Sequence, residues 1–372
     1  MSLKTLIGWT QATVNFWWGC TEVSPACVNC YAREWAKYSS RRLFGYLVEW
    51  GNGKPRAERL QAARKEAIAL ERKAVKEGVR IRVFANSMSD WLDDWVPIQW
   101  LAFLLETIRL TPHLDWQLLT KRPQNWQKRL EAVVAIERMG SHQGHIMAYQ
   151  WLRSTHESDV PPNVWIGTTV EDQTRANERI PHLLQIPAKI RFLSCEPLVG
   201  PVNLCFVGGS QVETPYRYRG NFWEVACENS CTFAGTEDDL VPDPDQSEAA
   251  ADEHGTEWVC PECHCSSALV RRHDEDPDIH WVIVGGMSGH GTPQFTHPDW
   301  IRGIRDQCAQ AGVAFFFKQW GNYIPAGYHA THLDPNKRYK ATHWMGLTML
   351  HAGKEATGNL LDNKIHEAFP TT

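Results

Sequence analysis

The feature that most constrains the fold of this chain is a repeated alternation of short apolar runs and helical segments, which begins near residue 80. Each apolar run is rich in aliphatic and aromatic residues and is followed by polar residues and a helical stretch. The runs occupy residues 81–87, 115–121, 164–170, 190–196, 281–286 and 313–319. Continuous apolar strands that alternate with helices are typical of parallel βα units buried on both faces. The pattern therefore predicts an α/β fold with a parallel sheet.

One more strand is expected within residues 5–16, ahead of this series. With it the sheet has about seven strands, fewer than the eight of a closed TIM barrel, so an open or partial βα TIM-like barrel is predicted. Residues 55–78 have apolar positions at helical spacing and many Lys and Arg residues. A solvated outer helix is the usual structure for such a segment, and a nucleic-acid contact is the alternative.

Composition excludes few classes of protein. Hydrophobic residues make up 43% of the chain and charged residues 22%, which is ordinary for a globular protein. No apolar run approaches the ~20 residues of a membrane span, and the first residues lack the features of a signal peptide. We therefore expect a cytoplasmic protein. Because the cytoplasm is reducing, the eleven cysteines are expected to serve as metal ligands in preference to forming disulfides. Cys195, Cys205 and Cys308 lie in or near apolar runs and are expected to be packed thiols.

The net charge of the chain is −5. This value argues against a surface coated for bulk nucleic-acid binding, although it leaves room for a local basic surface.

Three cysteines are clustered in the segment WWGCTEVSPACVNCY, residues 17–31. They are Cys20, Cys27 and Cys30, at C-x6-C-x2-C spacing. Pro25 and its polar neighbours favour a loop in which three thiolates can converge. A structural zinc ion takes four ligands, but the next cysteine is Cys195 and the first histidine is His113. Three cysteines without a fourth nearby ligand suit an iron–sulfur cluster that keeps one iron open. A zinc site completed by a distant residue and buried free cysteines are the alternatives.

Polar residues follow almost every predicted strand. They are Asn86, Ser87, Ser89, Asp90, Thr120, Lys121, Arg122, Thr168, Thr169, Glu171, Asp172, Ser194, Glu196, Gly285, Gly286, Lys318 and Gln319. Functional residues of βα barrels gather at the carboxyl ends of the strands. Loops are polar in any case, but Lys121 and Lys318 stand at the ends of buried strands, where a charge is costly unless it is paired or used. At least half of the set is therefore expected to line a ligand cavity.

Seven motifs resemble, in the same order, those of a phage-associated three-cysteine-motif protein family, a divergent branch of the radical S-adenosylmethionine (SAM) superfamily. They are GCTEVSPACVNCYARE, FANSMSDWL, LLTKRP, NVWIGTTVEDQ, RFLSCEPLVGPV, WVIVGGMSG and FFFKQWG, and they cover about residues 8–322 apart from one insertion. The superfamily's commonest spacing is C-x3-C-x2-C, so this loop is wider. Asn29 replaces a usually aromatic residue near the adenine, a role that Tyr31 is expected to take over. Met287 replaces an acid that is frequent in the family.

The resemblance implies a radical SAM partial barrel with a 4Fe-4S cluster held by Cys20, Cys27 and Cys30. SAM would bind the open iron through its amino and carboxylate groups, and its reductive cleavage would lead to hydrogen abstraction from the substrate. The residues assigned to SAM are Tyr31, Asn86, Ser87, Ser89, Thr168, Thr169, Glu171, Ser194, Gly285 and Gly286. Glu196 and Lys318 are assigned to catalysis as proton carriers. Asp90, Lys121 and Arg122 are assigned to the substrate.

The family's association with phages implies, by analogy only, a nucleic-acid or nucleotide substrate with a modified nucleobase. Rearrangement of a hypermodified thymidine in DNA by an isomerase is one such reaction, and it would require the base to be flipped out of a duplex. The analogy also implies an electron-donating reductase and a location in the phage-infected or bacterial host cytosol. Two rival functions stay open: a non-catalytic zinc-binding nucleic-acid-binding or adaptor protein, and a SAM-dependent methyltransferase without radical chemistry.

An insertion at residues 205–278 carries a second group of cysteines, Cys227-x3-Cys231 and Cys260-x2-Cys263, on either side of an acidic segment. Two such pairs are typical of a zinc ribbon, so Zn²⁺ is expected here, with Cys265, His264 or His254 as substitute ligands. The metal would fold a module with little core of its own, which could also grip a polynucleotide or a partner. The predicted domains are thus residues 1–204 and 279–325 for the barrel, 205–278 for the inserted module and 326–372 for a C-terminal extension.

Overall fold

The computed structural model describes residues 5, 7–137, 144–154, 159–204, 279–289, 292–328, 333–334 and 336–371, and the backbone of short strands at 206–207, 210–211, 223–227, 241–242, 258–259 and 268–272. The chain divides into two compact units. The larger unit comprises residues 1–217 and 277–372, and the smaller one residues 218–276. Among the described residues, no helix is long and apolar enough to cross a membrane.

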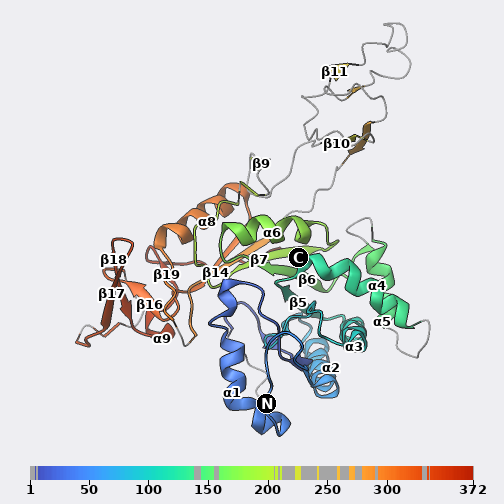
Figure 1. Cartoon of the computed structure of the whole chain (residues 1–372), viewed down its shortest axis with the longest axis horizontal. Helices are drawn as coiled ribbons and strands as arrows, with labels where there is room; N and C mark the ends of the chain where they lie inside the picture. Colours follow the sequence, from blue (N-terminus) through green and yellow to red (C-terminus); the bar gives the residue numbers. More distant parts are fainter. Residues whose placement is uncertain are drawn as a thin grey trace. The chain divides into compact units, whose positions relative to one another are not determined.

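Seven parallel strands form the central sheet of the larger unit and curl into a half-barrel (Figure 1). In spatial order they are β1 (Ala12–Thr13), β4 (Ile81–Ala85), β5 (Leu114–Thr120), β6 (Val164–Thr169), β7 (Ile190–Cys195), β14 (Trp281–Gly285) and β15 (Ala314–Gln319). All neighbouring strands pair in parallel. The strands follow one another in chain order, as in βα barrels, without the reversal of a doubly wound sheet. The predicted α/β fold with a parallel, half-barrel sheet is confirmed.

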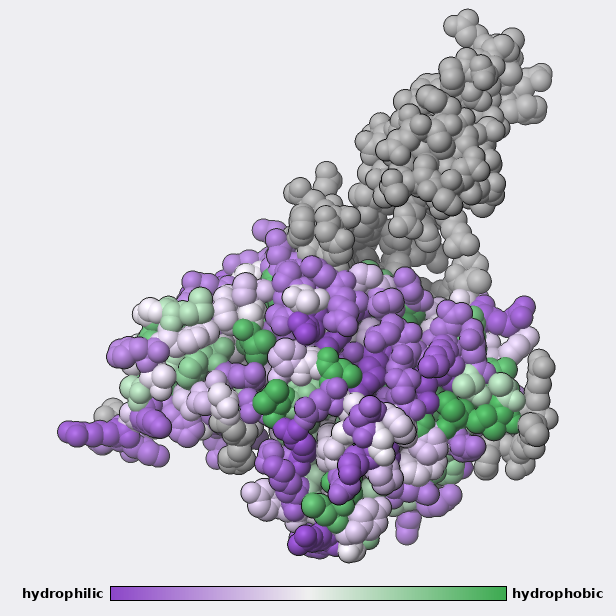
Figure 2. All heavy atoms as spheres, in the orientation of Figure 1, coloured by the Kyte–Doolittle hydropathy of each residue, from purple (hydrophilic) through white to green (hydrophobic). Residues whose placement is uncertain are grey.

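Helices connect the strands. They are α1 (Tyr31–Phe44), α2 (Leu60–Glu77), α3 (Ile98–Arg109), α4 (Trp126–Glu137), α5 (Gly144–Leu152), α6 (Gln173–Leu184), α8 (Pro298–Ala311) and α9 (Lys354–Thr357). The basic segment at 55–78 contains α2, which buries Ala63, Ala67, Leu70 and Ala74 on one face. The spacing of these residues by three or four places them together, so the outer-helix prediction is confirmed. Figure 2 shows that hydrophilic residues cover most of one face of the molecule.

The two faces of the sheet carry different cores. Alternate strand residues, such as Val83 and Val282, join the large core beneath the helices. The residues between them join a second core made of Trp9, Phe84, Trp165, Ile190, Phe192, Trp281, Ile283 and Phe316. This division follows from the period of two in a strand. Trp165, Ile190 and Trp281 stand at or near the first residues of their strands, so the second core fills the amino-terminal half of its face.

The C-terminal part of the chain adds small antiparallel elements and returns to the sheet. It holds the three-stranded sheet β16 (Tyr323–Pro325), β18 (Leu347–His351) and β17 (Lys340–Trp344), and the hairpin of β19 (Leu360–Leu361) and β20 (Lys364–Ile365). Beyond the hairpin, Phe317 N–H donates to the carbonyl of His366 at 2.8 Å, and the Phe369 ring lies 5.2 Å from that of Trp281. The end of the chain thus covers part of the second core.

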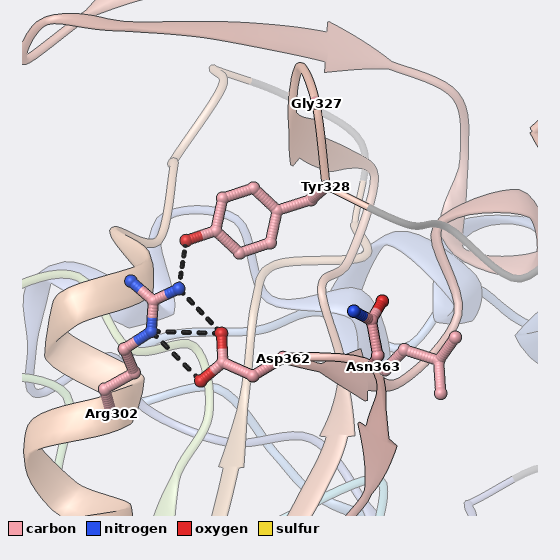
Figure 3. Close-up of a pocket in the computed structure, with 6 residues that line it drawn as sticks. Arg302, Gly327, Tyr328, Asp362 and Asn363 are labelled. Atoms are coloured by element: carbon pink, nitrogen blue, oxygen red, sulfur yellow. Dashed lines mark hydrogen bonds and ion pairs between the residues drawn. The ribbon is translucent and has the colours of Figure 1, made fainter.

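Charge pairing fastens this hairpin to α8. A pocket of about 250 Å³ lies there, lined by Arg302, Gly327, Tyr328, Leu360, Asp362 and Asn363 (Figure 3). Arg302 donates to both oxygens of Asp362 and to the Tyr328 hydroxyl. The charged groups and the tyrosine hydroxyl of the pocket therefore satisfy one another, and we assign them a structural role.

Four further two-stranded antiparallel pairs are described outside the main sheet. β2 (Trp17–Trp18) pairs with β3 (Ala57–Glu58), and β8 (Phe206–Val207) pairs with β9 (Ser210–Gln211). In the smaller unit, β10 (Trp223–Cys227) pairs with β13 (Ala268–Arg272), and β11 (Val241–Pro242) with β12 (Trp258–Val259).

Of the predicted zinc ligands, only the backbone of Cys227 is described, at the end of β10. Its side chain and the residues Cys231, Cys260, Cys263, Cys265, His254 and His264 lie outside the described residues, as does Cys205. The zinc ribbon stays a prediction. Cys195 and Cys308 are fully buried free thiols, as predicted.

Gly167 on β6 provides a test of the second core. A Cβ atom at this position would meet the Phe192 ring at 2.4 Å, and this ring is held by Trp9 and Trp281. We expect Gly167→Ala to lower the free energy of unfolding by about 1–3 kcal/mol, because overpacking forces the ring to shift. Urea denaturation followed by tryptophan fluorescence measures this change.

The matched control is Gly303→Ala within α8, where no atom lies within 4 Å of an added Cβ. It should raise stability by up to about 1 kcal/mol, since alanine favours helix. Equal effects of the two substitutions would contradict the packing described for Phe192.

Candidate functional site

Polar side chains replace the aromatic ones toward the carboxyl ends of the strands, on the face of the second core. Asn86 lies two positions after Phe84, and Lys318 two positions after Phe316. The same period along the other strands adds Lys121, Thr169, Glu171, Ser194, Glu196 and Gly285. Two contacts between strand ends support this arrangement: Lys121 with Glu171, and Lys318 with Glu196. Eight of the residues selected from the sequence therefore share one end of one sheet face.

Glu196 and Lys318 form an ion pair across the ends of β7 and β15. Lys318 Nζ lies 2.6 Å from Glu196 Oε1, and each side chain is 17% exposed. Gln319 Nε2 donates to the same oxygen at 3.4 Å. Glu196 Oε2 has no hydrogen-bond partner in the described part of the chain. Gly285 makes room for this carboxylate, because an added Cβ would lie 3.2 Å from Glu196 Cγ. The pair thus offers one free carboxylate oxygen at the strand ends.

Glu171 fastens the cysteine loop, which we define as residues 19–30, to the end of β6. Its carboxylate is 1% exposed and accepts from Lys121 Nζ at 3.0 Å and from Arg179 Nη1 at 2.7 Å. The hydroxyl of Ser24, in the middle of the loop, also donates to it. Burial alone would raise the pKa of Glu171, but Lys121 and Arg179 outweigh it and hold the pKa below its ordinary value. Glu171 is therefore a buried carboxylate whose oxygens are already occupied.

Asp90 is a second anchoring point. Its carboxylate accepts hydrogen bonds from the Thr120 hydroxyl, the backbone N–H groups of Leu92 and Lys121, and the Arg122 guanidinium. Arg122 in turn donates to the carbonyl of Thr21 at 2.6 Å and lies 3.8 Å from Cys20 Sγ. Asp90 and Arg122 were predicted to contact the substrate. In the structure Asp90 bonds to Arg122, and Arg122 bonds to Thr21, so the two residues connect the end of β5 to the cysteine loop.

The pair of Arg56 and Asp93 holds the same loop from the other side, and the sequence analysis missed it. Arg56 Nη2 lies 2.7 Å from Asp93 Oδ2, and both side chains are almost fully buried. Both also bond to Thr21, through its hydroxyl and its backbone N–H respectively. Arg56 stands in a segment without periodicity, GNGKPRAE, so nothing local marked it as buried. The only available signal was an acid within the tryptophan-rich segment that follows β4.

Two further contacts reach Ser87, just after β4, and Thr292, which follows β14 at a distance along the chain. The Tyr31 hydroxyl donates to the carbonyl of Ser87 at 2.9 Å, and Asn29 Nδ2 donates to the carbonyl of Thr292 at 3.0 Å. Burial raises the pKa of the Tyr31 hydroxyl, and the charges of Cys30 and Glu196 act in the same direction. The cysteine loop and the start of α1 are thus fixed to the ends of β4, β5 and β6, and to Thr292 further along the chain from β14.

The three clustered cysteines all lie in this fixed loop. Cys27 is buried, and Cys20 and Cys30 are partly exposed. Burial raises the pKa of Cys20, with Asp90 adding to it, while Arg122 acts in the opposite sense. Burial likewise raises the pKa of Cys30, and Cys27 contributes to the shift. Arg122 therefore favours a thiolate at Cys20, against the effect of burial.

These donors fit an iron–sulfur cluster in chemical kind, because cluster ligands are thiolates and a nearby cation stabilises them. Within the described residues, however, no group of three or more His, Cys, Asp or Glu side chains is arranged to hold a metal ion. Convergence of the three thiols on one cluster is therefore a proposal.

Several buried polar atoms near the loop lack partners among the described residues, among them Asn86 Nδ2, Ser89 Oγ and the indole N–H groups of Trp17 and Trp18. The other end of the Asn86 amide accepts from the backbone N–H of Phe16 at 2.8 Å, which fixes its orientation. A buried donor without an acceptor costs about 1–3 kcal/mol. Asn86 and Ser89, which the sequence analysis assigned to SAM, are the clearest candidates for binding a ligand's oxygen atoms.

Other residues assigned to SAM take part in packing. The Thr168 hydroxyl donates to the carbonyl of Thr120 at 2.9 Å. Thr168 directly precedes Thr169 on β6, so its side chain lies on the opposite face from the eight residues above. Gly286 allows close approach of the Trp320 carbonyl, and Met287 accepts a backbone hydrogen bond from Asn322. Ser87 is hydrogen-bonded to the Asn15 amide. The structure does not bring Thr168 or Gly286 to the polar strand ends.

The comparisons identify a family without identifying an activity. A family model described as "Protein of unknown function (DUF5131)" matches residues 4–370. No curated protein and no solved structure matches the chain.

Glu171→Gln tests the anchoring of the loop. The substitution removes the charge that Lys121 and Arg179 share, and loss of one partner of a buried pair costs about 3–5 kcal/mol. The folded-state pKa of Glu171 is depressed, so its contribution to stability is complete above the unfolded-state value of about 4.3 and is lost as the pH falls through the folded-state pKa. Urea denaturation from neutral pH into acid should show a smaller loss of stability for the variant than for the wild type.

Glu77→Gln is the matched control, because Glu77 forms an exposed pair with Lys73 on α2. It should change stability by less than about 1 kcal/mol. If Glu171→Gln behaved like this control, the loop would not depend on the buried carboxylate.

Proposed function

We propose that this chain, which belongs to the DUF5131 family of proteins of unknown function, is a radical SAM enzyme that acts on a modified nucleobase. The observation that carries the proposal is the attachment of the three-cysteine loop and the first residue of α1 to residues just after β4, β5 and β6 of a parallel half-barrel. In βα barrels this end holds the functional residues. The order of the motifs, from GCTEVSPACVNCYARE to FFFKQWG, supports the same assignment.

The proposed ligands of a 4Fe-4S cluster are Cys20, Cys27 and Cys30, with one iron left for SAM. When bound, the cluster and SAM together supply reductive cleavage of SAM and abstraction of hydrogen from an unreactive carbon of the substrate. The chain's own contribution is to orient the ligands and to exclude water. Arg122 stabilises the Cys20 thiolate, and the buried Trp17 and Trp18 precede the loop in β2 and shield it.

The SAM site in this proposal is formed by polar groups of the shared face. Asn86 Nδ2 and Ser89 Oγ donate to the carboxylate of SAM, because both are buried donors just after β4 that lack acceptors among the described residues. Thr169 and Ser194 are assigned to the ribose, and Gly285 allows the adenine to approach the backbone. Tyr31, held through its hydroxyl, provides a half-exposed ring for the adenine. Glu171 positions Lys121 and the loop, since its oxygens are occupied.

Glu196 and Lys318 are proposed to handle protons at the substrate. The free Oε2 of Glu196 can accept a proton or a substrate hydrogen bond, while Lys318 holds the other oxygen in place. Asp90 and Arg122 act through Cys20 and Thr21, and so we assign them a positioning role. Among the predicted substrate contacts, Lys121 keeps two further ammonium hydrogens for a substrate oxygen.

The substrate class rests on the family resemblance, which points to a nucleobase in a polynucleotide or nucleotide. Two partners complete the proposal: a reductase that donates electrons, and Zn²⁺ in the inserted module at Cys227, Cys231, Cys260 and Cys263. The zinc module would contribute to folding, and it would be a candidate grip for nucleic acid.

Anaerobic reconstitution with iron and sulfide tests the proposed function. The wild type should bind about four irons and one zinc ion per chain, and should form 5′-deoxyadenosine from SAM after reduction. Cys27→Ala should lose both the cluster absorbance and this product, because only two thiolates remain in the loop. Metal analysis, absorption spectroscopy and chromatography provide the measurements.

Cys308→Ala is the matched control, since Cys308 is a buried thiol on α8 outside the loop. It should keep the cluster and the product. Two zinc ions and no iron in the wild type would instead support the zinc-binding adaptor. Formation of S-adenosylhomocysteine without 5′-deoxyadenosine would indicate a methyltransferase.

A further inference from the structure

Helix α1 buries mainly small residues, and all of its large aromatic residues except Phe44 lie on the outside. The buried residues of this helix are Ala32, Ala36, Ser39 and Ser40. Tyr31, Trp35 and Tyr38 are exposed by 51%, 49% and 81% respectively. An amphipathic helix of a globular protein normally buries its larger apolar side chains. The inverted arrangement leaves aromatic surface in water, which indicates a binding surface more often than a random feature.

The exposed aromatic residues lie on one stripe. Residues 31, 35, 38 and 42 are separated by four, three and four positions, which places Tyr31, Trp35, Tyr38 and Arg42 on the same face of the helix. We call these four residues the α1 stripe. Trp35 packs against Trp18, with ring centroids 5.1 Å apart. No ring contact of Tyr38 occurs among the described residues, so packing does not explain its position.

The charge beside the stripe is positive. Arg41 and Arg42 are exposed and have no ion-pair partner in the described part of the chain. The remaining charges of the helix are paired: Lys37 with Glu34, and Arg33 with Glu22. Two unpaired guanidinium groups next to a row of flat rings fit a polyanion that also carries aromatic rings. A single-stranded polynucleotide has this chemistry, because its bases stack on aromatic side chains and its phosphates pair with Arg.

The stripe begins at the candidate site. Tyr31 directly follows Cys30, and its hydroxyl is bonded to the carbonyl of Ser87 at the end of β4. From there α1 runs away from the strand ends at the edge of the larger unit (Figure 1). A strand that lay along the stripe would therefore end beside the polar face that holds Asn86 and Glu196.

We propose that Trp35, Tyr38 and Arg42 of the α1 stripe, together with Arg41, bind single-stranded polynucleotide and deliver one base to the polar strand ends, while Tyr31 stays with the adenine of SAM. The inference deepens the proposed function and rests on it for the fate of that base, but the binding itself needs neither cluster nor SAM. It specifies the substrate as a base within a polynucleotide strand, in contrast to a free nucleotide. An electron-donating protein is the competing occupant of the same surface. The absence of aliphatic residues from the stripe and the unpaired arginines favour the polynucleotide.

Fluorescence anisotropy of the full-length chain with a labelled single-stranded oligothymidylate tests this proposal. Tyr38→Ala should weaken binding about tenfold, as expected for the loss of one stacked base. Its matched control is Tyr149→Ala on α5, which removes a tyrosine that is 50% exposed and lies far along the chain. This control should bind as the wild type does. Because Tyr38 has so little packing, the variant should keep the wild-type denaturation midpoint.

The arginines are tested separately by salt dependence. The double variant Arg41→Gln with Arg42→Gln should reduce the slope of log affinity against log salt by about 1.4, or about 0.7 for each phosphate of a single strand that is no longer neutralised. An unchanged slope would show that Arg41 and Arg42 do not contact phosphates, and it would overturn the proposal.

The outcomes separate this inference from the proposed function. No binding by the wild type, or equal binding by Tyr38→Ala, overturns the inference and leaves a protein partner as the occupant, even if 5′-deoxyadenosine is formed. Stripe-dependent binding supports the inference. If such binding occurs in a protein that forms neither cluster nor 5′-deoxyadenosine, the enzymatic proposal fails and the polynucleotide surface stands.

Discussion

The pairing of buried carboxylates with cations is the interaction on which the candidate site depends. Glu171 and Asp90 are nearly inaccessible to water, and neither can stay ionised there without partners. The partners come from consecutive residues at the end of β5: Lys121 pairs with Glu171, and Arg122 pairs with Asp90. The remaining bonding capacity of Glu171 and Arg122 is directed at the cysteine loop, through Ser24 and Thr21. The cations and hydrogen bonds that these buried carboxylates require therefore also hold the loop that carries the three cysteines.

The amino-terminal and carboxyl-terminal halves of the sheet face differ in chemistry. In the amino-terminal half, Phe192, Trp281 and their neighbours form an aromatic core that supplies rigidity through dry packing. In the carboxyl-terminal half the same columns of side chains change to Asn86, Glu196 and Lys318. A rigid, apolar base beneath a polar rim is the arrangement that keeps charged groups oriented without water. If the proposed function is correct, this rim would hold SAM and substrate while the loop holds the cluster.

The strands and their polar ends could be predicted because the signals are local. Continuous apolar runs identified six strands to within about two residues, as expected for buried parallel strands. The ion-pair partners could not be predicted, because pairing joins residues far apart in the chain. The prediction that Asp90 and Arg122 contact substrate stays untested, but the bond between them was not foreseen, and the pair of Arg56 with Asp93 was missed entirely. Thr168 was selected by position at a strand end, but period-two alternation turns it out of phase with the shared face. The assigned zinc ligands lie in a part of the chain where only the backbone of Cys227 is described.

The central claim is that Cys20, Cys27 and Cys30 hold one cluster with an iron that is open to SAM. Electron–nuclear double resonance on the reduced, reconstituted protein, with SAM isotopically labelled in its amino group, tests it most directly. The account predicts a change in the cluster's spectrum when SAM is added and a hyperfine coupling from the labelled nitrogen, because that nitrogen binds the open iron. A spectrum that is unchanged by SAM, with no coupling from the label, would contradict it.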